Sequence, residues 1–236
     1  MKKIFRGYAE QQALLHFLRK KKRLNVFVFF CFFIFQSLAF SENTVRITAL
    51  PGTVALTFDD GPSPIYTPQV LAILKKYNIK ATFFMVGENA EAHPALVRQV
   101  LAAGHSVNNH TMTHAMLTKL SDTGLYREVV VSENTLAHIM GKKPICLRYP
   151  FGASNSRVRE YIRAHGIVPV SMGFNSFDYE RRGTDKLISW VLKNAYSRQV
   201  ILMHDGYFNK EQTVAALPAI IEGIQKKGLG FSLICS

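Results

Sequence analysis

Val54-Ala55-Leu56-Thr57-Phe58-Asp59-Asp60-Gly61-Pro62 joins a short apolar run to two adjacent carboxylates and a Gly-Pro pair. An apolar run of this length, rich in β-forming residues, predicts a buried strand over 54–58. The Gly-Pro pair predicts a tight turn after the strand, so the side chains of Asp59 and Asp60 should point in different directions. Taken alone, the two acids are as readily interpreted as turn residues as catalytic ones.

Similar β-rich runs alternate along the chain with amphipathic stretches. Strands are predicted at 54–58, 81–86, 105–109, 145–149, 168–172, 199–203 and 231–234. Helices are predicted from Thr67-Pro68, from 94 to 104, over 122–140, from 155 to 166, and from near 185 and 211. Thr67 is the expected N-cap of the first helix, with Pro68 at its first position. This alternation predicts an α/β fold with a parallel sheet or barrel in a single domain.

Polar residues cluster where the predicted strands end. They are Asp59 and Asp60 at the first strand, His110 and His114 after the third, Arg148 at the fourth, Asp178 after the fifth, and His204 and Asp205 at the sixth. Because the C-terminal ends of the strands of a parallel barrel surround one mouth, we expect these side chains to converge.

The segment His110-Thr111-Met112-Thr113-His114 places two imidazoles four residues apart, on one face if it is helical. Two histidines and one carboxylate form a common catalytic metal site that leaves positions open for water and substrate. On its own the motif is a weak signal, because two histidines at this spacing are usually solvated. Together with Asp59-Asp60 it indicates a metal site.

Five motifs in order resemble the polysaccharide deacetylases of carbohydrate esterase family 4, also called the NodB homology domain. They are Thr57-Phe58-Asp59-Asp60-Gly61, His110-Thr111-Met112-Thr113-His114, Arg148-Tyr149-Pro150-Phe151-Gly152, Asp178-Tyr179 and Leu202-Met203-His204. The resemblance covers about 54–234 and implies a distorted (β/α)7-8 barrel in one NodB-type domain. It also implies hydrolysis of N-acetyl groups on N-acetylglucosamine units of peptidoglycan or a chitin-like glycan, with release of acetate.

The resemblance implies roles for the two acids and their neighbours. Asp60, His110 and His114 would hold one divalent metal ion, usually zinc, with cobalt or nickel as alternatives. Asp59 would be the general base for the attacking water. Arg148 would keep that carboxylate ionised, although a plain salt bridge at the barrel rim is the alternative interpretation.

Further roles follow from the same resemblance. His204 would protonate the leaving amine, and Asp178 would favour its imidazolium form unless it makes only a structural ion pair. The backbone N–H of Phe151 would stabilise the tetrahedral oxyanion. The other residues expected to contact substrate are Tyr149, Pro150, Leu202 and Tyr179. Leu202 and Tyr179 would line the pocket for the acetyl methyl, although either could be a core residue. Tyr179 departs from the tryptophan common in the family, which leaves the fit of the substrate open.

The N-terminal region is basic and then apolar. Residues 1–41 contain eight Lys or Arg and one acid, a charge of +7, so the rest of the chain carries the other +6 of the net +13. Residues 24–40 are uncharged. This pattern predicts a signal peptide over 1–41, or an uncleaved anchor that would attach the protein to the membrane. In both cases the domain, 42–236, would be exported to the periplasm, the cell envelope or the medium.

Cys146 and Cys235 lie at the ends of two apolar runs. Two thiols do not make a disulfide framework, so both are predicted to be small buried apolar residues.

A nucleic-acid partner is disfavoured because no Gly-rich phosphate loop precedes a helix, and no basic and aromatic stripe is present. Hydrolysis of a small amide or a cyclic imide on the same fold stays open. A catalytically silent protein that binds envelope glycans would be expected to lack the base or the acid, and both Asp59 and His204 are present.

Overall fold

The computed structural model describes residues 47–236. The predicted signal peptide or anchor at 1–41 lies outside this part of the chain. Eight strands form one sheet in the order β5-β4-β3-β2-β1-β7-β6, and β8 pairs with the first residues of β1. The strands are β1 (Thr53–Asp59), β2 (Thr82–Met85), β3 (Ser106–Asn109), β4 (Cys146–Arg148), β5 (Val168–Val170), β6 (Phe174–Asn175), β7 (Val200–His204) and β8 (Gly230–Phe231).

All strand pairs in this sheet are parallel. Within residues 47–236 no ladder joins β5 to β6, so the sheet forms a half-barrel that is open between these two strands. The predicted α/β class with a distorted barrel is therefore confirmed.

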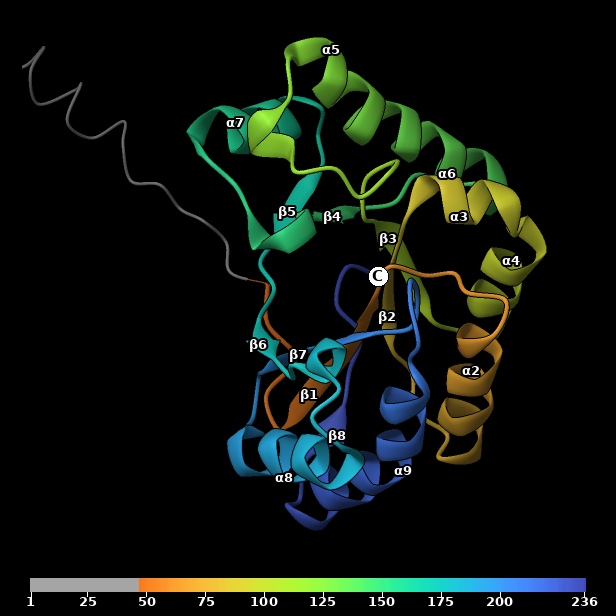
Figure 1. Ribbon diagram of the computed structural model, residues 1–236, viewed down its shortest axis with the longest axis vertical. Helices are drawn as coiled ribbons and strands as arrows, with labels where there is room; N and C mark the ends of the chain where they lie inside the picture. Colours follow the sequence, from red (N-terminus) through yellow and green to blue (C-terminus); the bar gives the residue numbers. More distant parts are fainter. Residues whose placement is uncertain (1–46) are drawn as a thin grey trace, which may run out of the picture. The chain divides into compact units, whose positions relative to one another are not determined.

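Helices cover the outside of the sheet (Figure 1). They are α2 (Tyr66–Lys76), α3 (Gly87–Ala92), α4 (Pro94–Ala102), α5 (Asp122–Leu125), α6 (Ser132–Met140), α7 (Ser156–Ala164), α8 (Thr184–Asn194) and α9 (Glu211–Lys226). A π-helical stretch, η2 (Tyr126–Val131), joins α5 to α6, and three short 3-10 turns are η1 (Leu117–Lys119), η3 (Pro150–Gly152) and η4 (Asp178–Glu180). Across residues 47–236 no helix combines the length and the apolar character needed to cross a bilayer.

The two faces of the sheet have different cores. Alternate residues such as Phe58, Phe83 and Met203 pack with residues of α2, α4, α8 and α9. The opposite face, the barrel interior, packs Ala55 and Phe84 against the C-terminal segment without any helix. Asp59 follows Ala55 by four residues along β1, so its side chain lies on the interior face.

The segment after β8 fills the interior below the strand ends. The carbonyl of Ile234 accepts a hydrogen bond from the Thr82 hydroxyl at 3.0 Å, and that of Cys235 accepts one from Ser106 at 2.7 Å. Cys235 forms a disulfide with Cys146, with 5.9 Å between the two Cα atoms. The prediction of two separate buried thiols is therefore wrong. The cysteines are 89 positions apart, and the return of the chain into the barrel leaves no local sequence signal.

Three local predictions differ from the structure. The strand expected at 231–234 is limited to β8, because the following residues enter the barrel interior. Strand β6 was not predicted, so Asp178 follows β6 rather than the fifth strand. Helix α2 begins at Tyr66, so Thr67 is not its N-cap; its hydroxyl donates instead to Asp205 at 2.6 Å.

Candidate active site

A fully buried ion pair joins the end of β1 to the end of β4. Nη1 of Arg148 donates to Oδ1 of Asp59 at 2.6 Å and to the Thr57 hydroxyl at 2.8 Å. The guanidinium lies 4.1 Å from the centroid of the Phe84 ring and is 0% exposed. Burial lowers the pKa of Arg148, while the charge of Asp59 and the hydrogen bond to it oppose that effect. The pair lies in the interior rather than at an exposed rim, and ion pairs buried so deeply are weak evidence of a stabilising role.

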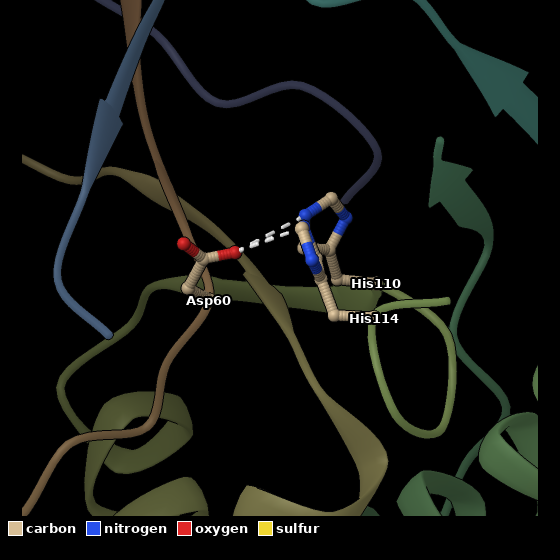
Figure 2. A group of neighbouring side chains, drawn as sticks. All are labelled: Asp60, His110 and His114. Atoms are coloured by element: carbon tan, nitrogen blue, oxygen red, sulfur yellow. Dashed lines mark ion pairs between the residues drawn. The ribbon is translucent and has the colours of Figure 1, made fainter. Parts of the chain in front are cut away.

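The carboxylate of Asp60 faces the imidazoles of His110 and His114 (Figure 2). The backbone of Asp60 is left-handed, with φ 73°. Oδ1 of Asp60 lies 3.4 Å from Nε2 of His110 and 3.3 Å from Nε2 of His114. The ligand atoms of the three residues lie within 4.8 Å of one another, close enough to hold one ion.

The donor set fits a metal ion. Oδ1 of Asp60 is buried and has no hydrogen-bond partner within residues 47–236. Nδ1 of His110 donates to the carbonyl of Arg148 at 2.9 Å, the usual outer contact of a metal-binding imidazole, which turns Nε2 toward Asp60. Burial lowers the pKa of His114, which favours the neutral form that binds metals.

The loop that carries the two histidines is not helical. It leaves β3 at Asn109, and both Thr111 and His114 are left-handed, with φ of 70° and 60°. Oδ1 of Asn109 accepts the N–H of Thr111 at 2.8 Å, and Glu128 accepts both the N–H and the hydroxyl of Thr113 at 2.9 and 2.8 Å. Sequence reasoning missed Glu128, because an acid in the middle of a predicted helix is normally solvated.

A second acid–imidazole pair lies at the end of β7. Asp59 and His204 are paired residues in the β1–β7 ladder. Nδ1 of His204 lies 2.7 Å from Oδ1 of Asp178, whose Oδ2 accepts the His204 backbone N–H and the Thr213 hydroxyl, both at 2.8 Å. The ring of Tyr179 is 47% exposed and meets the His204 ring edge-on at 5.5 Å between centroids.

The pKa of His204 is raised and that of Asp178 is lowered. Burial alone would lower the pKa of His204, but the hydrogen bond to Asp178 and the charge of that carboxylate outweigh it, so the His204 pKa is raised. Burial would raise the pKa of Asp178, but hydrogen bonds from His204 and Thr213 and the charge of His204 lower it. The geometry therefore favours an ionised carboxylate beside an imidazolium.

The remaining predicted substrate residues lie around the same strand ends. Tyr149 and Pro150 are buried, and the Tyr149 hydroxyl has no hydrogen-bond partner within residues 47–236. Phe151 is left-handed, with φ 59°, and its ring lies 4.6 Å from that of His114. Leu202 is buried on the same face of β7 as His204.

Asp205 and Gly206 fasten the end of β7 to the acid pair. Their backbone N–H groups donate to the carbonyl of Asp59 at 3.1 and 3.3 Å. A Cβ at Gly206 would lie 1.9 Å from the carbonyl oxygen of Asp60, so only glycine fits here. The Asp205 side chain is fully buried, accepts a hydrogen bond from Thr67 at Oδ2, and has no partner at Oδ1 within residues 47–236. Burial, partly opposed by the Thr67 hydrogen bond, raises the pKa of this carboxyl to about 7.

The structure thus brings together all the metal-ligand, base and acid candidates that the sequence predicts. A possible metal-ligand group lies beside Asp59, and Asp59 is paired on the neighbouring strand with His204, an imidazole of raised pKa. This arrangement is typical of metal-dependent hydrolases.

Comparisons with known proteins agree with this class. A family model described as polysaccharide deacetylase matches residues 47–170. A peptidoglycan-N-acetylglucosamine deacetylase of Bacillus cereus is 38% identical over 180 residues, which cover 75% of this chain and 84% of that protein. A chitooligosaccharide deacetylase of Bradyrhizobium sp. is 33% identical, with 75% and 86% covered. The chain therefore belongs to the polysaccharide deacetylase family.

A solved structure shows the same fold. The Bc1960 peptidoglycan N-acetylglucosamine deacetylase superposes with a TM-score of 0.76 at 31% identity, over 80% of this chain and 89% of that chain. The family predicted from the five motifs is confirmed.

Proposed function

We propose that this chain is a metal-dependent polysaccharide N-deacetylase that hydrolyses N-acetyl groups on N-acetylglucosamine units and releases acetate. The substrate would be peptidoglycan or a chitin-like oligosaccharide, the two glycan classes in the names of its relatives. The observation that carries the proposal is the pairing of a candidate base, Asp59, with a candidate acid, His204, on neighbouring strands beside the metal-ligand group. A catalytically silent protein that only binds glycans would not need both the base and the acid.

Asp60, His110 and His114 would hold the divalent ion. Two imidazole nitrogens and one carboxylate oxygen suit zinc, with cobalt or nickel as alternatives. Such an ion polarises a carbonyl oxygen and makes water more acidic.

Asp59 would take the proton from the attacking water. Its Oδ1 is bound by Arg148, while its Oδ2 lies 3.7 Å from Nε2 of His110 and so faces the metal-ligand group. Because the Arg148 guanidinium occupies Oδ1, Oδ2 is the atom available to accept a proton.

His204 would then give a proton to the leaving amine from Nε2, because Nδ1 is held by Asp178. The raised pKa of His204 keeps the imidazolium populated near neutral pH. We further propose that the N–H of Phe151 stabilises the oxyanion and that Leu202 and Tyr179 contact the acetyl methyl.

The proposed location is outside the cytoplasm, in the periplasm, the cell envelope or the medium. The Cys146–Cys235 disulfide supports it, since such bonds persist in oxidising compartments. Residues 1–41 would be a signal peptide or an anchor, and 42–236 the catalytic domain.

The test is acetate release from a panel of N-acetylglucosamine oligomers, peptidoglycan, a small amide and a cyclic imide. We expect release from the glycans, loss of activity with a chelator, and recovery with zinc or cobalt. The substitution Asp59→Asn should abolish turnover. The variant should still bind zinc as tightly as the unmodified protein does, because Asp59 is not among the proposed ligands. Hydrolysis of only the small amide or the imide by the zinc-loaded protein would refute the glycan proposal.

A further inference from the structure

The connection between β7 and α9 presents two aromatic side chains in an unusual backbone conformation. Tyr207 and Phe208 are both left-handed, with φ of 43° and 47°. Bulky residues rarely adopt this region. The Phe208 side chain is 91% exposed, whereas Tyr207 is partly buried. Strain of this kind tends to collect at functional sites, where the surrounding structure imposes it.

The connection is fastened at both ends. At its start, Asp205 and Gly206 donate to the carbonyl of Asp59, and Gly206 packs against the carbonyl of Asp60 without room for a side chain. At its end, Oδ1 of Asn209 accepts the N–H of Glu211 at 2.9 Å. Figure 1 shows this connection beside the end of β1. The two aromatic residues are therefore held at a fixed place relative to the candidate metal ligands.

The aromatic surface begins at a metal-ligand candidate and runs outward. The Tyr207 ring lies 5.7 Å from that of His114, and the Phe208 ring lies 6.4 Å from that of Tyr207. Phe151, 59% exposed, lies against the same imidazole. These rings adjoin one another through His114 and form a contiguous aromatic patch beside the candidate metal ligands. A contiguous exposed patch, unlike a single exposed ring, indicates a surface that a ligand covers.

We propose that Tyr207 and Phe208 form a subsite for the sugar next to the one that loses its acetyl group, an inference that rests on the function proposed above. A β-linked pyranose has an apolar face of C–H bonds and carries its hydroxyl groups at the rim. An aromatic ring buries such a face and leaves the hydroxyl groups in water. Residues 206–209, Gly-Tyr-Phe-Asn, carry no charge, so the surface suits a neutral sugar ring rather than an anionic group.

The test is binding of N-acetylglucosamine and of its tetrasaccharide to the full chain, measured by calorimetry after chelation so that no acetate is released during the titration. The tetrasaccharide should bind more tightly than the monosaccharide because only the tetrasaccharide reaches the subsite. Phe208→Ala should raise the Kd of the tetrasaccharide about tenfold, equivalent to about 1.4 kcal/mol, and remove most of the advantage of length. Phe208→Trp should retain it. Folding should be little affected, since the ring is almost fully exposed.

Tyr196→Ala is the matched control. Tyr196 is 62% exposed but lies before β7, at the opposite end of that strand from His204, so this variant should bind as the unmodified chain does. An unchanged Kd in Phe208→Ala, or an equal loss in Tyr196→Ala, would overturn the subsite. So would a Phe208→Ala variant that alters only the mass of the protein in sedimentation, because the ring would then cover a second copy of the chain. If no glycan releases acetate, the proposed function fails, whereas the binding comparison reports on the subsite by itself.

Discussion

Replacing Asp178 by asparagine is expected to move the alkaline limb of the pH–rate profile to lower pH. The buried carboxylate lies 2.7 Å from Nδ1 of His204 and raises the pKa of that imidazole against the opposing effect of burial. The asparagine side chain would carry no charge, and its amide N–H₂ could donate to the neutral ring. Burial would then dominate, so the pKa of His204 should fall.

The size of the shift follows from the contact. An opposite charge within about 4–6 Å changes a pKa by about 1–3 units, and one unit corresponds to about 1.36 kcal/mol. The midpoint of the alkaline limb should therefore lie about 1–3 pH units lower in the variant. At a pH above the midpoints of both proteins, the rate of the variant should be about ten- to thousandfold lower than that of the unmodified protein. At lower pH, where His204 is protonated in both proteins, most of the rate should return.

The same pair contributes to stability over a defined pH window. The lowered pKa of Asp178 gives stability that is present above the ordinary carboxyl value of 3.8 and is lost as the pH falls through the folded value. The raised pKa of His204 gives stability that is present below 6.5 and is lost as the pH rises through the folded value. The variant should therefore differ most from the unmodified protein between these two limits.

Two measurements test the reasoning. Acetate release is followed against pH, and the His204 imidazole is titrated by NMR in the metal-free protein. Thr213→Val is the control, since it removes one hydrogen bond to Asp178 and leaves its charge, so its shift should be much smaller. A His204 midpoint that is the same in Asp178→Asn and the unmodified protein would refute the assigned cause.

Three more predictions concern other parts of the molecule. The pKa of Asp205 is about 7 in the folded protein against an ordinary 3.8, so its contribution to stability is present below pH 3.8 and is lost as the pH rises through about 7. In thermal melts, Asp205→Asn should therefore show a smaller decline of melting temperature over this pH range. A decline equal to that of the unmodified protein would contradict the prediction. Replacing both Cys146 and Cys235 by serine should lower the free energy of unfolding by about 2–4 kcal/mol in urea melts, and a reductant should then have no further effect. Glu128→Gln should weaken zinc binding about tenfold in a chelator competition, because the amide presents N–H groups to the Thr113 donors; equal affinity would remove Glu128 from the support of the loop.

The sequence was sufficient to place the residues that follow from strand topology. Asp59 and His204 could be brought together because parallel strands deliver their C-terminal ends to one mouth. The spacing of His110 and His114 indicated a shared ion, although the segment is a loop with left-handed residues and not a helix. The spacing of the two histidines therefore predicted which residues could share an ion, but not the backbone conformation that brings them together.

The sequence could not identify side chains that act across elements. Thr213 lies on α9 and binds Asp178, and Cys235 pairs with Cys146 on a strand 89 positions earlier. Each partner is defined by packing between segments distant in the chain. A hydroxyl on a helix or a single cysteine near a strand end carries no local signal of such a partner.

Asp59 and His204 are paired in the β1–β7 ladder, so the geometry of the hydrolytic step depends on the sheet, whereas the choice of glycan depends on the loops. Neighbouring strands lie about 4.8 Å apart, a spacing maintained by backbone hydrogen bonds and independent of loop sequence. The residues at 179–183 and 207–209, which lie outside the contacts that hold Asp59 and His204, can therefore be altered without moving the two proton-transfer groups relative to each other. We expect loop exchange among related chains to change which glycan is accepted and how long it must be, while the hydrolytic step stays the same.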